Sequence, residues 1–404
     1  MSRRPRLPLA LAVLALLSAC DGGASSTGGG PTRTSSSTSS STSSTEASAT
    51  STSTAAPTTA PTQAPTADAC AVGNQSPPHA TISAGFATAL AFAPDGRLFW
   101  AERSGTVRVW QSGASRVFAR VATVTSEAGG GYSERGLLGL ALSRSFSSDH
   151  YVFAFYSDTN YTQQHVIRWV DCAGSARNAR VIVTLPSGPD CCHKGGRLAV
   201  GPDDKLYVTL GDEHTSSSAQ NTRDVRGKVL RYNLDGSVPA DNPFGGGDPV
   251  WAYGLRNPFG LAISPSGQIA ISSNGPSGDS GSPSTGYDTV VLSVGRGAGY
   301  QWPLCYGYSH PLQSSNCGGR TPPDWSSENS TVVPTGMTFV DASGPAAYAG
   351  HLVMCTFSRG MLVFTPGSPH ATASSGPSQC NLDVKEGPDH ALYYSDSGHI
   401  YRLA

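Results

Sequence analysis

The sequence predicts an all-β fold, a β-propeller preceded by a signal peptide and a disordered Ser/Thr/Pro-rich linker. A loose repeat supports this prediction: an alternating strand, a Pro-Asp-Gly-like turn and a second alternating strand recur at 89–110, 197–212, 260–275 and 382–403. No stretch of useful length has the period of an amphipathic helix. Repeats of about 40 to 55 residues would make about six to eight blades, and a strand at 399–403 would complete one of them. A β-sandwich or β-helix explains the repeated turn less well.

Residues 1–20 are predicted to be a lipoprotein signal peptide. A basic start precedes an apolar stretch at 7–17, which is shorter than the ~20 residues that span a bilayer. The ending Leu-Ser-Ala-Cys at 17–20 resembles the bacterial lipobox, in which Cys20 is lipidated and becomes the mature N-terminus. An ordinary signal peptide with an unrelated cysteine is the alternative. The lipobox predicts an exported protein, anchored by lipid to the outer face of the bacterial cell membrane.

Composition divides the rest of the chain into a tether and a folded domain. Residues 21–68 consist mostly of Ser, Thr, Gly, Pro and Ala, so they bury too little apolar surface to fold and are expected to be disordered. The propeller is therefore expected at 69–404. The net charge of −1, from 27 basic and 28 acidic residues without a basic cluster in this domain, gives no sign of nucleic-acid binding.

The cysteines predict disulfides. Nine are present, and eight remain if Cys20 is lipidated. An even number in an exported protein favours disulfides over zinc, and no CxxC pair occurs. Cys305 and Cys317 are expected to pair locally. Cys191 and Cys192 leave two alternatives: a vicinal disulfide, or two separate bridges, one of them to Cys172.

Eight segments of the chain resemble, in order, the motifs of one known family. They are ERGLLGL (134–140), HKGGR (193–197), LYV with GD (206–212), GKVLR (227–231), PADNP (239–243), GLRNP (254–258), NGP (274–276) and GYQWP (299–303). The chain thereby resembles the glucose/sorbosone dehydrogenase family, six-bladed propellers that use pyrroloquinoline quinone (PQQ) and calcium. The resemblance implies six blades and both cofactors.

The resemblance also implies three catalytic residues. His193 matches the family's general base, a role that suits histidine because its ordinary pKa, about 6.5, lies near working pH. Asp212 matches the carboxylate that orients this base and fixes its tautomer. Arg256 matches an arginine beside the quinone, where a preplaced charge stabilises developing negative charge. On the residues alone, a loop histidine, a turn aspartate and a loop-holding arginine remain the alternatives.

Further residues are implied in cofactor and metal binding. The cofactor-binding candidates are Glu134, Arg256, Asn257 and Arg359, with Lys194 or Arg135 as additional cations. Gly275 and Pro276 match the pair whose backbone carbonyls bind calcium, an ion that takes oxygen ligands. Nearby Asp279 and Asp288 are expected either to assist that ion or to be solvated loop carboxylates.

Three departures from the family pattern concern the cofactor and the substrate. Sugar-oxidising members grip the quinone's carboxylates with an arginine pair, and both arginines are absent at 380–384. Phe259 stands where those members often have Gln. The cysteine pair 191–192 stands where an acidic residue contacts the substrate, so glucose is not the expected substrate. A vicinal ring here would resemble one that stacks on the quinone in a different class of quinoproteins.

The leading prediction is a PQQ- and calcium-dependent oxidoreductase that acts on a sugar or polyol at the cell surface. Electrons would pass to an external acceptor, because no haem-attachment CxxCH occurs. The alternative is a redox-inactive propeller that binds a carbohydrate or protein partner, since fold alone does not fix function. A calcium-dependent lactonase is a third possibility, but it requires a cluster of carboxylates and Asn that the sequence does not assemble.

Overall fold

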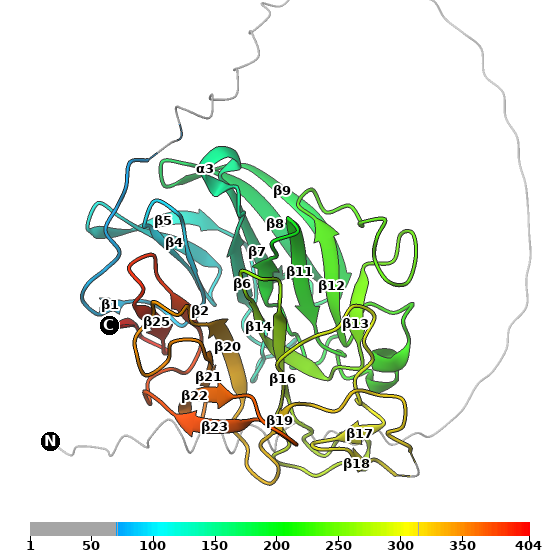
Figure 1. Cartoon of the computed structure of the whole chain (residues 1–404). Coiled ribbons are helices and arrows are strands. Elements are labelled where there is room, and N and C mark those ends of the chain that lie inside the picture. Colours follow the sequence, from blue (N-terminus) through cyan, green and yellow to red (C-terminus); the bar gives the residue numbers. More distant parts are fainter. Residues whose placement is uncertain (1–69, 71, 314) are drawn as a thin grey trace, which may run out of the picture.

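The protein is described by a computed structural model that covers residues 70, 72–313 and 315–404. The predicted signal peptide and the whole of the predicted linker lie outside these residues. Within them, six four-stranded antiparallel sheets form a six-bladed β-propeller (Figure 1). The prediction of an all-β propeller with six blades is confirmed. No helix in this part of the chain is long and apolar enough to cross a membrane.

Each blade runs from an innermost to an outermost strand. Blade 1 contains β2 (Ala87–Phe92), β3 (Leu98–Glu102), β4 (Thr106–Gln111) and β5 (Ala114–Arg120); blade 2 contains β6 (Leu137–Leu142), β7 (Tyr151–Ser157), β8 (Gln163–Cys172) and β9 (Ser175–Pro186). Blade 3 contains β10 (Leu198–Val200), β11 (Lys205–Leu210), β12 (Lys228–Asn233) and β13 (Val250–Tyr253); blade 4 contains β14 (Asn257–Ile263), β15 (Ile269–Asn274), β16 (Thr289–Val291) and β19 (Trp325–Ser326). Blade 5 contains β20 (Pro334–Phe339), β21 (Leu352–Thr356), β22 (Gly360–Thr365) and β23 (Thr372–Ser375); blade 6 contains β24 (Val384–Glu386), β25 (Leu392–Ser395), β26 (His399–Leu403) and β1 (Ile82–Ser83).

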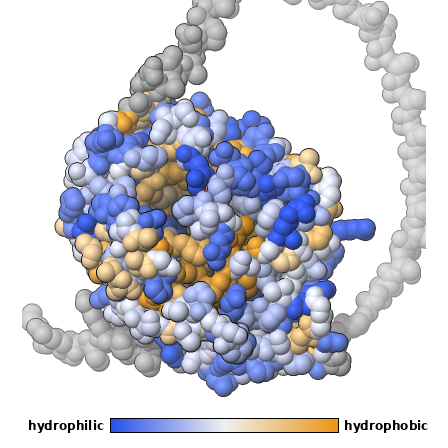
Figure 2. All heavy atoms as spheres, viewed as in Figure 1, coloured by the Kyte–Doolittle hydropathy of each residue, from blue (hydrophilic) through white to orange (hydrophobic). Residues whose placement is uncertain are grey.

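A few short elements lie between the blade strands. They are the hairpin β17 (Cys305–Tyr306) and β18 (His310–Pro311), the helix α3 (Phe146–Asp149), and the 3-10 helices η1 (Ser216–Gln220) and η2 (Asp279–Gly281). The face turned to the viewer in Figure 2 is hollowed near its middle, and apolar side chains border the hollow.

The ring closes by pairing strands from the two ends of the propeller. In blade 6, Ile82 of β1 lies opposite Ile400 of β26, and Ser83 lies opposite His399. The prediction that the final strand completes a blade is confirmed. Because the closure is an antiparallel ladder, the first and last blades are held together by backbone hydrogen bonds as well as by packing.

Apolar clusters fill the space between adjacent blades. Their side chains come from buried strands, in which successive residues point to opposite faces of the sheet. In β3, Leu98 and Trp100 pack against blade 6, whereas Phe99 packs on the opposite side against blade 2. Phe118 of blade 1 meets Trp169 of blade 2 edge to face, with ring centroids 6.0 Å apart. Because side chains alternate across a strand, a buried strand such as β3 contributes to two clusters at once.

A polar cluster ties the inner strands together on the propeller axis. The Arg197 guanidinium donates to the carbonyl of Thr88 in blade 1, to that of Phe259 in blade 4 at 2.7 Å, and to that of Leu382 beside blade 6 at 2.8 Å. Asp383 lies 4.0 Å from this guanidinium and accepts a hydrogen bond from the backbone N–H of Leu90 at 2.8 Å. One buried side chain therefore satisfies carbonyls from three blades.

The eight described cysteines form four disulfides. Cys305 bonds Cys317, as predicted, and Cys355 bonds Cys380. Cys191 and Cys192 form the vicinal disulfide, so the alternative of two separate bridges is wrong. Cys172, at the end of β8, bonds Cys70 instead, because the segment before blade 1 lies against it and the backbone N–H of Ala173 donates to the Cys70 carbonyl.

Replacing Arg197 with Met is expected to lower the free energy of unfolding by about 3–5 kcal/mol, because three buried carbonyls would lose their donor. The control is Arg402→Met, which breaks an ion pair with Asp389 near the surface of blade 6 and is expected to cost at most about 1 kcal/mol. Chemical denaturation of both variants measures the difference. Equal losses would contradict a special role for Arg197.

Candidate active site

A pocket lies at one end of the ring of blades. It is bordered by the segments that lead into the innermost strand of each of several blades and by the segments that follow the second strands. Six predicted site residues line it: Glu134, His193, Arg256, Asn257, Gly275 and Pro276. Its empty volume, including the part open to solvent, is about 900 Å³. In an antiparallel blade the start of the first strand lies beside the end of the second, so these residues meet at one end of the ring.

The hairpin of β10 and β11 brings His193 and Asp212 together. Leu198 pairs with Val208, and the chain continues on both sides so that Nδ1 of His193 lies 2.6 Å from Oδ1 of Asp212. A Cβ on Gly211 would lie 2.0 Å from the carbonyl oxygen of His193, so only glycine permits this approach. The predicted pairing of these two side chains is therefore present in the structure.

Asp212 is held as a carboxylate behind the imidazole. Its second oxygen accepts a hydrogen bond from the indole N–H of Trp302 at 2.7 Å. Burial alone would raise the pKa of Asp212, but His193, Arg256 and the Trp302 N–H hold it below its usual value. An ionised Asp212 accepts a hydrogen bond from the Nδ1–H of His193, which leaves Nε2 of His193 as the basic nitrogen. Sequence reasoning quoted Trp302 within the GYQWP motif but gave it no role.

Arg256 is fixed by a carboxylate that the sequence did not connect with it. Its guanidinium binds both oxygens of Asp279, at 2.8 and 2.9 Å, and lies 5.6 Å from the Trp302 ring centroid. Burial would raise the pKa of Asp279, but the bonds and charge of Arg256 hold it well below its usual range. Asp279 is therefore a partner of Arg256 rather than a solvated loop residue.

Glu134 and Asn257 join segments from three blades. The Asn257 amide donates to both carboxylate oxygens of Glu134, at 3.0 and 3.1 Å, and its Oδ1 accepts from the backbone N–H of Gly195 at 3.2 Å. The backbone N–H of Lys194 donates to Glu134 at 3.1 Å. Side chains that are held on two sides in this way keep a fixed position in the pocket.

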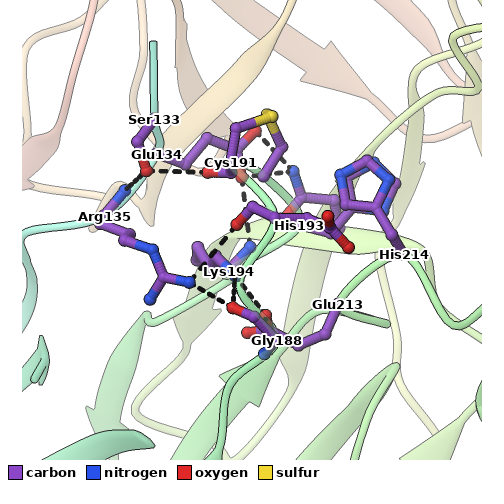
Figure 3. Close-up of a disulfide and its surroundings, with 12 residues drawn as sticks. Ser133, Glu134, Arg135, Gly188, Cys191, His193, Lys194, Glu213 and His214 are labelled. Carbon is purple, nitrogen blue, oxygen red and sulfur yellow. Dashed lines mark hydrogen bonds and ion pairs between the residues drawn. A yellow bond between two sulfur atoms is a disulfide. The ribbon is translucent and has the colours of Figure 1, made fainter. Parts of the chain in front are cut away.

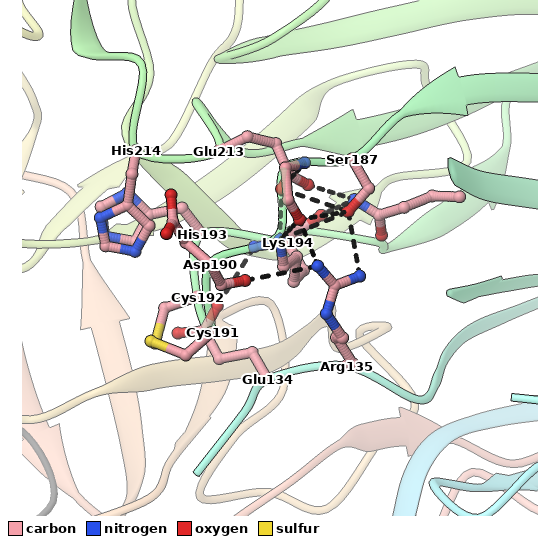
Figure 4. A network of polar contacts seen from close by, with 12 residues as sticks. Glu134, Arg135, Ser187, Asp190, Cys191, Cys192, His193, Lys194, Glu213 and His214 are labelled. Carbon is pink, nitrogen blue, oxygen red and sulfur yellow. Dashed lines mark hydrogen bonds and ion pairs between the residues drawn. A yellow bond between two sulfur atoms is a disulfide. The ribbon is translucent and has the colours of Figure 1, made fainter. Parts of the chain in front are cut away.

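Lys194 and Arg135, the two additional cations expected to help bind the cofactor, do not line the pocket. The Lys194 ammonium is fully buried, pairs with Glu213 and donates to the carbonyl of Gly188 at 3.2 Å (Figure 4). Burial lowers the pKa of Lys194. Arg135 is buried beside it and donates to the carbonyls of Gly188 and Asp190. Both side chains instead donate hydrogen bonds to backbone carbonyls of the loop before His193.

The segment 274–276 can provide oxygen ligands. Oδ1 of Asn274, a pocket-lining residue, is buried and has no hydrogen-bond partner among the described residues. A Cβ on Gly275 would lie 2.1 Å from the carbonyl of Gly286, so a glycine is needed for this packing. The Asp288 carboxylate supports the segment by accepting from the backbone N–H groups of Gly275, Val332 and Val333 at 2.7–3.0 Å. An unpaired side-chain oxygen and the neighbouring backbone carbonyls are ligand types that calcium takes.

Arg359 is exposed and does not line the pocket. It follows β21, and its backbone N–H donates to the Thr356 hydroxyl at 3.1 Å. The next residue on this loop toward the pocket, Ser358, hydrogen-bonds to the carbonyls of Thr331 and Val332. Among the described lining residues, Arg256 is the only arginine or lysine. The pocket is therefore poor in cations.

Comparison with known proteins agrees with this geometry. Residues 86–402 match the family model described as Glucose / Sorbosone dehydrogenase. The chain belongs to the glucose/sorbosone dehydrogenase family. It is 32% identical over 255 residues to quinoprotein glucose dehydrogenase B of Acinetobacter calcoaceticus, a match that covers 54% of this chain and half of that protein. It is 29% identical over 230 residues to the aldose sugar dehydrogenase YliI of Escherichia coli K12, covering 54% of this chain and 58% of that protein.

Solved structures of the glucose/sorbosone dehydrogenase type share the fold. An oxidoreductase described as a glucose dehydrogenase, from Thermus thermophilus, matches with a TM-score of 0.67 and 28% identity over 80% of this chain and all of that chain. The PQQ-bound aldose sugar dehydrogenase of Streptomyces coelicolor matches with a TM-score of 0.64 and 22% identity over 81% of this chain and 99% of that chain. The second likeness supports the fold alone.

His214, which sequence reasoning did not single out, stacks on His193. The ring centroids are 3.9 Å apart and the ring planes differ by 14°. Burial of the ring, followed by electrostatic repulsion from His193 when that residue is protonated, lowers the pKa of His214 to about 4, although His214 keeps an exposed part in the pocket. In the sequence, the only sign of this second ring was the position of His214 two residues after Asp212.

An NMR pH titration is expected to show His214 losing its charge near pH 4 instead of about 6.5. The unfolded chain would then bind this proton at higher pH than the folded protein, so stability falls as pH drops from about 6.5 towards 4. His193→Gln removes the charged neighbour and should move the His214 midpoint upward. A midpoint near 6.5 in the unmodified protein would contradict the assignment.

Proposed function

We propose that the protein is a PQQ- and calcium-dependent oxidoreductase that oxidises a hydroxyl or hemiacetal of a sugar or polyol. The observation that carries the proposal is the His193–Asp212 pair facing a small-molecule pocket. The family and the similarity to named glucose and aldose sugar dehydrogenases support it. An external acceptor takes the electrons.

The chain's own residues handle the proton. Nε2 of His193 accepts the proton of the substrate hydroxyl, while Asp212 stabilises the resulting imidazolium through Nδ1. Trp302 keeps Asp212 in place, so the imidazole does not rotate during the transfer. When bound, PQQ supplies the two-electron acceptor for the hydride that leaves the substrate carbon.

Several pocket residues fit the cofactors. Arg256 and Asn257 would hold the reactive part of the quinone, with Glu134 positioning Asn257. The carbonyls of Gly275 and Pro276, together with Oδ1 of Asn274, would hold calcium. Arg359, at the end of a neighbouring loop, is proposed to reach the cofactor's carboxylates, a contact that needs a change of its exposed side chain.

A redox-inactive binding propeller remains the second candidate, because Arg256 is the only arginine or lysine that lines the described pocket. The lactonase has less support. Glu134, Asp279 and Asp288 line the pocket with two asparagines, yet no three carboxylates in the described part of the chain converge within 4.8 Å.

The location is also proposed. An exported protein anchored at Cys20 to the outer face of the bacterial cell membrane would fold in an oxidising compartment. The four disulfides of the propeller support this, because such bonds persist outside the reducing cytosol. The membrane contact would be the lipid anchor alone.

Adding PQQ and calcium to the purified protein is expected to give a bound quinone absorbance that shifts when sugar is added. Chelation of calcium should release the cofactor or abolish the shift, because the ion bridges the protein and the quinone in this proposal. The measurement is an absorbance titration with and without a chelator. No retention at micromolar PQQ would favour the redox-inactive alternative.

His193→Ala is expected to lower dye reduction by about 10²- to 10⁴-fold, because the base that takes the hydroxyl proton is lost. Cofactor retention should stay intact. His399→Ala, at an exposed position on β26, is the matched control and should leave both unchanged. Unchanged turnover in His193→Ala would remove His193 from the mechanism.

A further inference from the structure

The vicinal disulfide Cys191–Cys192 has no evident role in global stability. The other three disulfides join cysteines 102, 12 and 25 residues apart, whereas this one joins neighbours. A cross-link stabilises mainly by restricting the unfolded chain, and the effect grows with the length of the loop that it closes. A ring that spans one peptide bond closes almost no loop. Its role must therefore be local.

The ring lies directly beside the proposed base. Both cysteines are buried, and Cys192 lines the pocket together with His193 and His214. Figure 3 shows the disulfide of Cys191 in the same view as His193 and His214. A ring nitrogen of His214 and the two sulfur atoms all lie within 4.8 Å of one another. The disulfide, the His214 ring and the stacked His193 ring therefore form one continuous surface.

The protein fixes this surface from both sides. The carbonyl of Cys191 accepts two hydrogen bonds of 2.9 Å, from the backbone N–H of Glu134 and the hydroxyl of Ser133. On the other side, Glu213 and His214 have positive φ values of 52° and 56°, which are uncommon for residues other than glycine. The buried pair of Lys194 with Glu213 holds that turn.

We propose that the Cys191–Cys192 ring, held beside His214, forms a rigid wall that selects substrates lacking a hydroxyl on the carbon next to the reacting one. The proposal rests on the proposed function, in that it places the reacting hydroxyl at Nε2 of His193. That hydroxyl must come within about 2.6–3.2 Å of the nitrogen. The atoms bonded to the reacting carbon then lie against whatever flanks His193.

The chemistry of the wall explains the selection. Cysteine sulfur is a weak hydrogen-bond acceptor, and a disulfide has no donor. A substrate hydroxyl pressed against the disulfide loses water and gains at most a weak acceptor, which is unfavourable, whereas a CH₂ group at the same position loses nothing. The preferred class is therefore deoxy sugars, in which the carbon next to the reacting one carries no hydroxyl.

The test compares 2-deoxy-D-glucose with D-glucose, using the protein loaded with calcium and PQQ. The unmodified protein is expected to favour the deoxy sugar by about tenfold or more in kcat/KM. The double variant Cys191→Ser/Cys192→Ser replaces the ring with two hydroxyl groups and should bring this ratio to about one or below. His214→Ala changes an exposed residue that supports the disulfide, and it should lower the ratio with the disulfide intact.

The matched control is Cys70→Ser/Cys172→Ser, which removes a disulfide whose cysteines do not line the pocket. It should lower the thermal unfolding midpoint more than the vicinal variant does, and it should leave the sugar ratio unchanged. A structural role for the vicinal ring would give the opposite result, a lowered midpoint with an unchanged ratio, and that would overturn the proposal.

A second readout separates this inference from the proposed function. Calorimetry without an electron acceptor gives the ratio of Kd for the two sugars with no sustained turnover. A Kd ratio that falls in the vicinal variant supports the wall even if no variant oxidises sugar, in which case only the proposed function fails. A Kd ratio identical in all variants overturns the wall whatever the activity.

Discussion

The placement of the site depends on the position of Arg197 on the propeller axis. This guanidinium binds backbone carbonyls from blades 1 and 4 and beside blade 6, and it lies four residues after His193. In the HKGGR motif, Arg197 therefore has a structural role and His193 is the candidate functional residue. Its two glycines have positive φ, and a Cβ on Gly196 would lie 2.8 Å from Phe155, so they turn the chain where a larger residue would not fit. Because Arg197 is held by these carbonyls, the short segment between it and His193 starts from a fixed position.

The charges around the pocket are arranged in pairs. Asp212 faces His193, Asp279 faces Arg256, and Lys194 faces Glu213. Burying an unpaired charge is costly, so each partner allows its neighbour to lie in a site that excludes water. The polar atoms that remain for a ligand in the described pocket include Nε2 of His193 and the unpaired Oδ1 of Asn274. Such a site is already organised before a ligand arrives.

The sequence predicted the parts of the molecule that local pattern controls. Alternation and turn residues reflect burial on two faces, so the propeller and the approach of His193 to Asp212 could be predicted from the repeat and the family motif. The partners of Arg256, Lys194 and Arg135 could not, because a long side chain reaches across several loops and tertiary structure chooses its partner. The stacked His214 has the same origin, since it depends on two successive residues in left-handed conformations.

The presence of a single arginine and no lysine among the described lining residues has an electrostatic consequence for the proposed function. A trianionic cofactor gains about 1.5–3 kcal/mol from each charge-assisted hydrogen bond, and the arginine pair at 380–384 is absent. Arg256 cannot compensate fully, because Asp279 already takes two of its donors. Asp383, which remains in that segment, accepts from Leu90 on the axis and contributes no positive charge to the pocket. The calcium ion at 274–276 would then be the largest positive charge near the quinone, and cofactor affinity would follow calcium occupancy more closely than in a pocket with the arginine pair.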